Sequence, residues 1–397
     1  MLWFDRLAVL VGMVVLVISP SAGGAAGAGG VAATPPLSPE LQTQITSAID
    51  RALGYLKAAQ EPEGGWVEPS GPSITAMVAQ CFAQDPRYGP SHPVTQRALR
   101  FVLKSRQSDG GIYNPADGLR NYGTSVCLMF LSALPETDPE VRRAREQAVR
   151  FLKGLQWAEH HKDNEGKPIT PDHVWYGGAG YGREKRPDLS NTQMMLEALK
   201  QSGLPSDDPT YQKALRFVQR CQMLSETNDQ PFARHAEDGG FIYTPANGGE
   251  SKAGTILVDG RPMLRSYGSM TYAGFKSLLY ANVSRDDVRV RKALEWIRKH
   301  YTLDENPNLP GQQSKQGLYY YYHVFARALA AWGEPTITDA QGHQHPWRTD
   351  LARKLLSLQR PDGSWVNEAD RWMEGVPQLV TAYSVLALQT VLKDAGF

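Results

Sequence analysis

The residues best suited to chemistry lie where apolar segments of this chain begin. The candidates for catalysis are Asp188, which precedes the third such segment, and Tyr322 and His323 in the fifth. A buried carboxylic acid can donate a proton, whereas tyrosine or histidine can remove one. Candidates for a ligand pocket occupy similar places in several segments, and they are Arg120, Tyr122, Asn191, Arg265, Tyr267 and Tyr383.

Each candidate also has a purely structural explanation. Asp188 is placed to cap the helix that follows it, because a side-chain oxygen there can accept from unpaired backbone N–H groups. The tyrosines can pack with bonded hydroxyls, the arginines can pair with carboxylates, and His323 can be an ordinary buried histidine. His343 and His345 have no third ligand nearby in the sequence, so we expect neither a metal nor a cofactor.

The elements that position these residues form a unit repeated six times. Each copy has a charged amphipathic segment, a glutamine, a Gly-rich turn and a nearly uncharged apolar segment. Such self-similarity indicates stacked supersecondary units. The glutamines are Gln60, Gln107, Gln156, Gln222 and Gln359, and Tyr301 takes this place in the fifth copy.

Both segments of the unit read as helices. The first has apolar residues at helical spacing with Lys and Arg between them, as in 148–156, which predicts a helix with one wet face. The second is apolar all round, as in 122–134 and 377–392, which predicts a buried helix. We therefore predict an all-α fold, an (α/α)6 toroid with inner helices around an axis and outer helices around them. The sixth apolar segment is as uncharged as the middle ones, which favours a closed ring.

The turn after the glutamine carries a family resemblance. Gln60-Glu-Pro-Glu-Gly-Gly-Trp66 and Gln359-Arg-Pro-Asp-Gly-Ser-Trp365 both have Gln, three residues, Gly, one residue and an aromatic. This resembles the repeat of squalene–hopene cyclases and of protein prenyltransferase β-subunits, and Gln107 begins a shortened version. The resemblance implies the toroid, a bracing role for these Gln and Trp residues, and an isoprenoid-like ligand.

The catalytic motifs of those families are missing from the sequence. It has no Asp-x-Asp-Asp acid motif, no Asp-x-Cys of a zinc site, and no Cys-Gly-Glu-Gln thioester motif. Three hypotheses therefore stay open. One is an apolar central cavity that binds, or also converts, an isoprenoid or similar lipid. Another is a carbohydrate-active enzyme on the same ring, in which tyrosine or histidine removes a proton from a uronate held by arginine. The third is a non-catalytic, partner-binding ring.

The N-terminus and the overall charge bear on location and partners. Residues 1–28 read as a signal peptide, because Arg6 precedes an apolar run at 7–18, and a retained anchor is the alternative. We expect a flexible linker at 29–38, one toroid domain at 39–397, and export to the periplasm or the medium. A net charge of +1 does not indicate a nucleic-acid partner, so we expect none. Peripheral membrane contact and the oligomeric state stay open.

Overall fold

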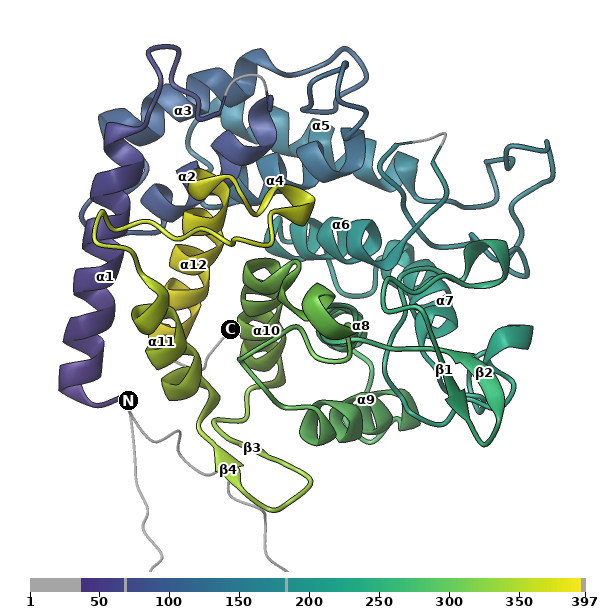
Figure 1. Cartoon of the computed structure of the whole chain (residues 1–397). Helices are drawn as coiled ribbons and strands as arrows, with labels where there is room; N and C mark the ends of the chain where they lie inside the picture. The colour runs from purple at the N-terminus through teal and green to yellow at the C-terminus, as the bar shows by residue number, and fades with distance from the viewer. Residues whose placement is uncertain (1–36, 68–69, 183–184, 394–397) are drawn as a thin grey trace, which may run out of the picture. The chain divides into compact units, whose positions relative to one another are not determined.

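The computed structural model describes residues 37–67, 70–182 and 185–393 (Figure 1). The expected signal peptide at 1–28 lies outside the described residues, as does most of the expected linker. The ring described below belongs to the unit Thr34–Phe397 and is considered by itself.

Twelve α-helices alternate between an outer and an inner layer within the described residues. The outer helices are α1 (Pro39–Ala58), α3 (Pro93–Lys104), α5 (Pro139–Leu155), α7 (Pro209–Cys221), α9 (Val288–Lys299) and α11 (Trp347–Leu358). The inner helices are α2 (Pro72–Ala83), α4 (Arg120–Ser132), α6 (Leu189–Gln201), α8 (Gly268–Tyr280), α10 (Leu318–Trp332) and α12 (Pro377–Leu392). Inner helices are buried along most of their length, whereas outer helices bury one face, as the sequence pattern predicts.

Short elements fill the connections between helices. β1 (Thr255–Val258) pairs antiparallel with β2 (Arg261–Leu264), and β3 (Ile337–Thr338) pairs with β4 (Gln344–His345). The 3-10 turns are η1 (Pro231–Ala233), η2 (Ala246–Gly248), η3 (Gly311–Lys315) and η4 (Arg371–Met373). In η4, Trp372 and Met373 both have positive φ, at 58° and 65°.

The inner helices close into a ring. Each packs against the inner helix before and after it, and α12 packs against α2 (Figure 1). The first outer helix, α1, also packs against α11 and α12 at the junction of the sixth and first units. The predicted all-α toroid is therefore confirmed, and the ring is closed rather than an open solenoid.

The repeated glutamines join neighbouring units. In four units the amide nitrogen donates to a carbonyl of its own turn and to a carbonyl of the next outer helix, at 2.8 to 3.0 Å. Each such pair satisfies a carbonyl of the turn and adds a second hydrogen bond to a carbonyl of the next outer helix, which links the two units. The interhelix pairs are Gln60–Val94, Gln156–Thr210, Gln222–Arg289 and Gln359–Ala48. Gln107 differs, because it donates only to carbonyls of its own unit, those of Ser105 and Tyr113.

The aromatic residues of the motif tie the turn to both helices of a unit. The indole nitrogen of Trp66 donates to the Leu56 carbonyl at 2.7 Å, and its backbone N–H donates to the Thr75 hydroxyl at 3.0 Å. Trp365 repeats both bonds with Leu355 and Thr381. These contacts fix where α2 and α12 begin, and they therefore position the first-turn residues of these two helices at that end of the ring.

Candidate functional site

A cavity of about 420 Å³ lies on the ring axis at the N-terminal ends of the inner helices. We call it the axial pocket. Its wall combines first-turn residues of inner helices with residues of the outer-to-inner connections, the rim where the sequence has its longest insertions. Six of the lining residues are tyrosines, namely Tyr122, Tyr181, Tyr243, Tyr267, Tyr320 and Tyr383. Six apolar side chains also line it, namely Ile74, Leu119, Met270, Trp372, Met373 and Leu379. The rest of the wall is made of small or polar residues and of the charged residues Asp117 and Lys252.

Several hydroxyl groups in the wall form hydrogen bonds with one another. The Tyr122 and Tyr383 hydroxyls are 3.3 Å apart, and the Tyr320 hydroxyl lies 3.2 Å from that of Ser190. Burial raises the pKa of Tyr122 to about 12, so this phenol is neutral at ordinary pH. The wall is therefore rich in aromatic rings, with Asp117 and Lys252 as its charged members. Aromatic rings suit hydrocarbon and can also stabilise a positive charge through their faces.

Asp188 lies directly behind this wall. It is the N-cap of α6 and accepts hydrogen bonds from the backbone N–H of Asn191 at 2.8 Å and from its side-chain amide at 2.9 Å. Its side chain also bonds Tyr243, and both Asn191 and Tyr243 line the axial pocket. Only 2 % of Asp188 is exposed, and burial raises its pKa to about 6 despite the hydrogen bonds. The residue is thus a helix cap and also a buried acid that protonates more readily than usual.

Sequence reasoning missed a second buried carboxyl, that of Glu374. Its oxygens accept from the Tyr320 backbone N–H at 2.7 Å and from the Asn367 amide at 2.6 Å, so it caps α10 from the connection before α12. Burial raises its pKa to about 7. It directly follows Met373, which lines the pocket. No local spacing in the sequence signals this role, because the cap and its helix belong to different units.

The structure divides the predicted pocket residues into two groups. Tyr122, Asn191, Tyr267 and Tyr383 all line the axial pocket. The two arginines are not among its lining residues. The Arg120 guanidinium lies 5.6 Å from the centre of the Tyr113 ring, and Arg265 bonds the connection before it through its backbone.

The predicted base candidates on α10 also face other surroundings. The Tyr322 hydroxyl donates to the Leu303 carbonyl at 2.7 Å, away from the pocket. His323 is buried one turn deeper than Tyr320, with its ring 5.5 Å from that of Tyr383. Burial lowers the pKa of His323 to about 3, so it is neutral. In the described residues, Tyr322 and His323 do not meet Arg120 and Arg265 at the axial pocket, so these candidates do not assemble the expected uronate-lyase site there.

No cluster of three or more His, Cys, Asp or Glu that could hold a metal ion occurs in residues 37–67, 70–182 and 185–393. His343 and His345 instead both contact Asp339, at 3.1 and 3.0 Å. Within the same residues, every helix is too short or too polar to span a bilayer.

Solved structures with the same architecture include terpene cyclases. A variant of the type II terpene cyclase MstE from Scytonema, in complex with its substrate geranylgeranyl dihydroxybenzoate, matches with a TM-score of 0.54. The match covers 89% of this chain and 98% of that one, at 16% identity. The chain has a terpenoid-cyclase-like fold. A polysaccharide lyase also matches, with a TM-score of 0.51 over 88% of this chain and 97% of that one at 13% identity, so the match shows a shared ring only.

Comparison of sequences gives short matches to terpene synthases. A drimenyl diphosphate synthase of Streptomyces showdoensis is 38% identical over 74 residues, which are 18% of this chain and 14% of that protein. Another, from Streptantibioticus cattleyicolor, is 30% identical over 139 residues, which are 31% of this chain and 25% of that protein. The matched part therefore spans a quarter or less of each relative. Known protein-family models give no match.

Proposed function

We propose that this protein binds an isoprenoid or similarly apolar ligand in the axial pocket. The observation that carries the proposal is the wall itself, in which tyrosines and apolar side chains are twelve of the twenty lining residues around about 420 Å³. That volume falls within the roughly 300–1,000 Å³ typical of small-molecule sites. The terpenoid-cyclase-like fold and the short matches to drimenyl diphosphate synthases support the same ligand class.

The pocket also contains the parts for converting such a ligand. Protonated Asp188 can donate its proton to the Tyr243 oxygen while the Tyr243 hydroxyl proton passes to one carbon of an alkene. The alkene π electrons form the new C–H bond, and the adjacent carbon becomes a cation that a second alkene can attack. Loss of a proton from the resulting cation restores neutrality, and solvent reprotonates Asp188. The tyrosine faces would stabilise the intermediate cation.

We infer from the N-terminal sequence that the protein is exported. Export fits a protein that carries an apolar ligand outside the cytoplasm. A lipid ligand outside the cytoplasm needs a protein that shields it from water. We propose this location as part of the function, and a fusion of residues 1–38 to a reporter enzyme measures it. Reporter activity outside the cytoplasm is the expected result, and activity confined to the cytoplasm would remove export from the proposal.

Binding of geranylgeraniol tests the ligand class. Leu379 lines the pocket and is buried, so Leu379→Trp should fill part of the cavity. Leu257 is 75 % exposed on the β1–β2 hairpin, so Leu257→Trp is a matched control. We expect saturable binding by the wild type and by Leu257→Trp, and loss of at least tenfold in affinity for Leu379→Trp, with circular dichroism showing that all three fold. Equal binding by all three proteins would place the ligand elsewhere.

A further inference from the structure

The connection that precedes α12 covers part of the axial pocket. It includes η4, and its residues Trp372 and Met373 both line the cavity. These two residues are 43 % and 45 % exposed, so each faces the cavity and also solvent. We call residues 367–375 the strap. The strap therefore separates the ligand site from water at this point of the rim.

The strap backbone is strained at the same two residues. Trp372 and Met373 both have positive φ, in the left-handed region that bulky side chains rarely adopt. Such outliers persist only where the surrounding structure holds them, and they are concentrated at ligand clamps and switch regions. Two in succession, at the strap residues that line the pocket, favour a segment that can relax to a second conformation.

Three other connections of the rim are joined to the ring through their backbone. In each, an N–H at the start of an inner helix donates to a carbonyl of the connection in the next unit. The pairs are Asn121–Tyr181, Leu189–Tyr243 and Gly268–Pro307, at 2.9, 2.8 and 2.8 Å. Because the acceptor is a main-chain carbonyl, these connections cannot leave the ring without a change in the path of the chain.

The strap is joined to the ring by a side chain instead. Within the described residues, every backbone–backbone hydrogen bond of the strap stays inside its own connection. The Glu374 carboxylate, in a residue only 1 % exposed, takes the place of the carbonyl and accepts from the Tyr320 N–H in the first turn of α10. The N-cap of α10, Gly317, has no side chain that could do this. Rotation of side-chain bonds can therefore release the strap while the ring stays folded.

The remaining hydrogen bonds between the strap and the ring also use side chains. The Asn367 amide donates to the Lys315 carbonyl at 2.7 Å, and the exposed Arg371 donates to the Gln316 side chain at 3.2 Å. Inside the strap, the Asn367 N–H donates to the Glu374 carbonyl at 3.0 Å and closes the segment on itself. The strap can therefore move as one body.

The strap rests on a glycine. A Cβ on Gly317 would lie 2.9 Å from the Trp372 ring, so the ring packs directly against backbone. The Trp372 indole makes no hydrogen bond to any residue that the structure describes. This contact is apolar and has no interlocking side chain, so it can break and form again as the strap moves.

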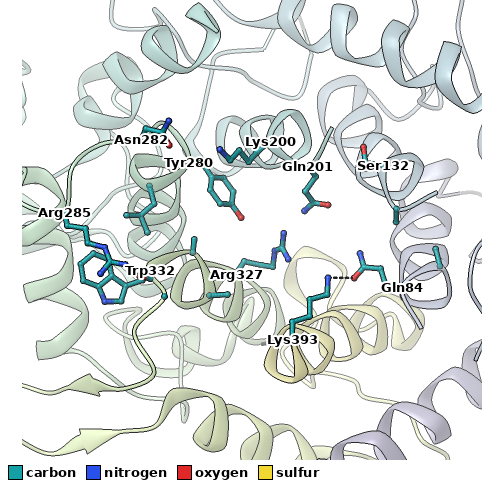
Figure 2. Close-up of a pocket in the computed structure, with 16 residues that line it drawn as sticks. Gln84, Ser132, Lys200, Gln201, Tyr280, Asn282, Arg285, Arg327, Trp332 and Lys393 are labelled. Atoms are coloured by element: carbon teal, nitrogen blue, oxygen red, sulfur yellow. Dashed lines mark hydrogen bonds between the residues drawn. The ribbon is translucent and has the colours of Figure 1, made fainter. Parts of the chain in front are cut away.

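Entry from the opposite end of the ring is unfavourable. A second cavity of about 810 Å³ lies there, with Gln201, Tyr280 and Arg327 directed into it (Figure 2). Between the two cavities Glu197 on α6 forms an ion pair with Lys276 on α8, and each side chain is 1 % exposed. An apolar ligand from that side would have to separate this buried pair, which is costly.

We propose that the strap is a lid over the axial pocket and that Glu374 is the residue that holds it closed. Release of Glu374 from α10 lets Trp372 and Met373 move outward, which opens the pocket, and return of the carboxylate encloses the ligand. The nature of that ligand rests on the function proposed above, whereas the movement itself can be measured without any ligand. If Glu374 were only a helix cap, its bond to Tyr320 would open only when α10 frays.

Hydrogen exchange of the ligand-free protein, resolved to single residues, separates these two cases. The Tyr320 N–H bonds the strap, whereas the next N–H, that of Tyr321, bonds the Gly317 carbonyl within the helix. Lid opening predicts that Tyr320 exchanges about tenfold or more faster than Tyr321, after correction for intrinsic rates. Equal protection of the two would mean that they open together by fraying, and it would overturn the proposal.

Glu374→Gln tests the role of the carboxylate. Glutamine keeps the shape and an acceptor oxygen, but a neutral acceptor bonds an N–H about half as strongly as a charged one. Exchange of Tyr320 should become about fivefold or more faster, with Tyr321 unchanged. Asp138→Asn is the matched control, because Asp138 caps outer helix α5 through its carboxylate and lies outside the strap. Acceleration of both tyrosines, or of neither, would contradict the role of Glu374.

Stopped-flow binding of geranylgeraniol measures the lid in use. The observed rate should level off at high ligand concentration, where lid opening becomes limiting. Glu374→Gln should raise that limit and the dissociation rate by a similar factor, with affinity changed less than twofold, because the Glu374 bond is present before and after binding. A rate that stays proportional to concentration and is equal in both proteins would overturn the lid. Absence of geranylgeraniol binding would remove the ligand class alone, and hydrogen exchange would then decide on the lid.

Discussion

Replacement of Asp188 by asparagine separates its capping role from its role as an acid. Asparagine keeps an acceptor oxygen for the Asn191 backbone N–H, and it is as good an N-cap as aspartate. It removes the charge that burial disfavours. The pKa of Asp188 rises from 3.8 to about 6 on folding, and a shift of this size corresponds to about 3 kcal/mol between the two protonation states.

The sign of this effect fixes the expected pH dependence. The folded state binds the Asp188 proton more tightly than the unfolded state, so its contribution is fully present below about pH 4. That contribution is lost as the pH rises through about 6. The free energy of unfolding of Asp188→Asn, relative to the wild type, should therefore increase by about 2.4 kcal/mol between pH 4 and pH 8, because part of the total is already lost at pH 4. Urea denaturation followed by circular dichroism at several pH values measures it.

Asp188→Asn should lower the catalytic turnover although it raises the stability at high pH. If Asp188 starts a reaction of the bound ligand, Asp188→Asn should reduce turnover by about a hundredfold or more, the usual contribution of a general acid. Wild-type turnover should fall as the pH rises above about 6, where the acid loses its proton. A stability difference that is flat between pH 4 and pH 8 would show that Asp188 is an ordinary ionised cap, and unchanged turnover would remove it as the acid.

Two further predictions concern the glutamines that join the units and the buried ion pairs of Glu197 with Lys276 and Arg327. Gln222→Ala should lower the free energy of unfolding by about 1–3 kcal/mol, because it leaves the buried Gly239 carbonyl unpaired and removes the link to the Arg289 carbonyl of the next unit. Gln107→Ala should cost less, since the hydrogen bonds of the Gln107 side chain stay within its own unit. Equal losses in urea denaturation would contradict a bracing role between units. Glu197→Gln should cost about 3–5 kcal/mol by leaving Lys276 and Arg327 buried without an anion, and a second change, Lys276→Met, should restore part of that loss. A double variant less stable than Glu197→Gln alone would show that the unpaired Lys276 is not the source of the loss.

The fold was predictable because the same sequence pattern recurs in the six units. The Gln-to-Trp spacing, the amphipathic segment and the uncharged segment recur along the chain. A helix that is hard to predict in one copy is therefore indicated by the equivalent segments of the other copies. The same repetition brought Tyr122 and Tyr267 to the axial pocket, since they occupy similar positions in two copies. Position within a unit therefore carries information about position in the ring.

Orientation within a helix was harder to predict. In the tyrosine run of α10, Tyr320 lines the pocket, whereas the Tyr322 hydroxyl reaches the Leu303 carbonyl on another side. Successive residues of a helix turn by about 100°, so two positions are enough to change the face. Long-range contacts were also out of reach, because Glu374 caps α10 from the next unit.

The most direct test of the central claim is native mass spectrometry of the protein purified from its own host, followed by extraction of the bound material. We predict an adduct with the mass of an isoprenoid on the wild type and on Leu257→Trp, and its absence from Leu379→Trp. A wild-type protein that carries no lipid and takes up none when incubated with geranylgeraniol would contradict the assignment of the axial pocket.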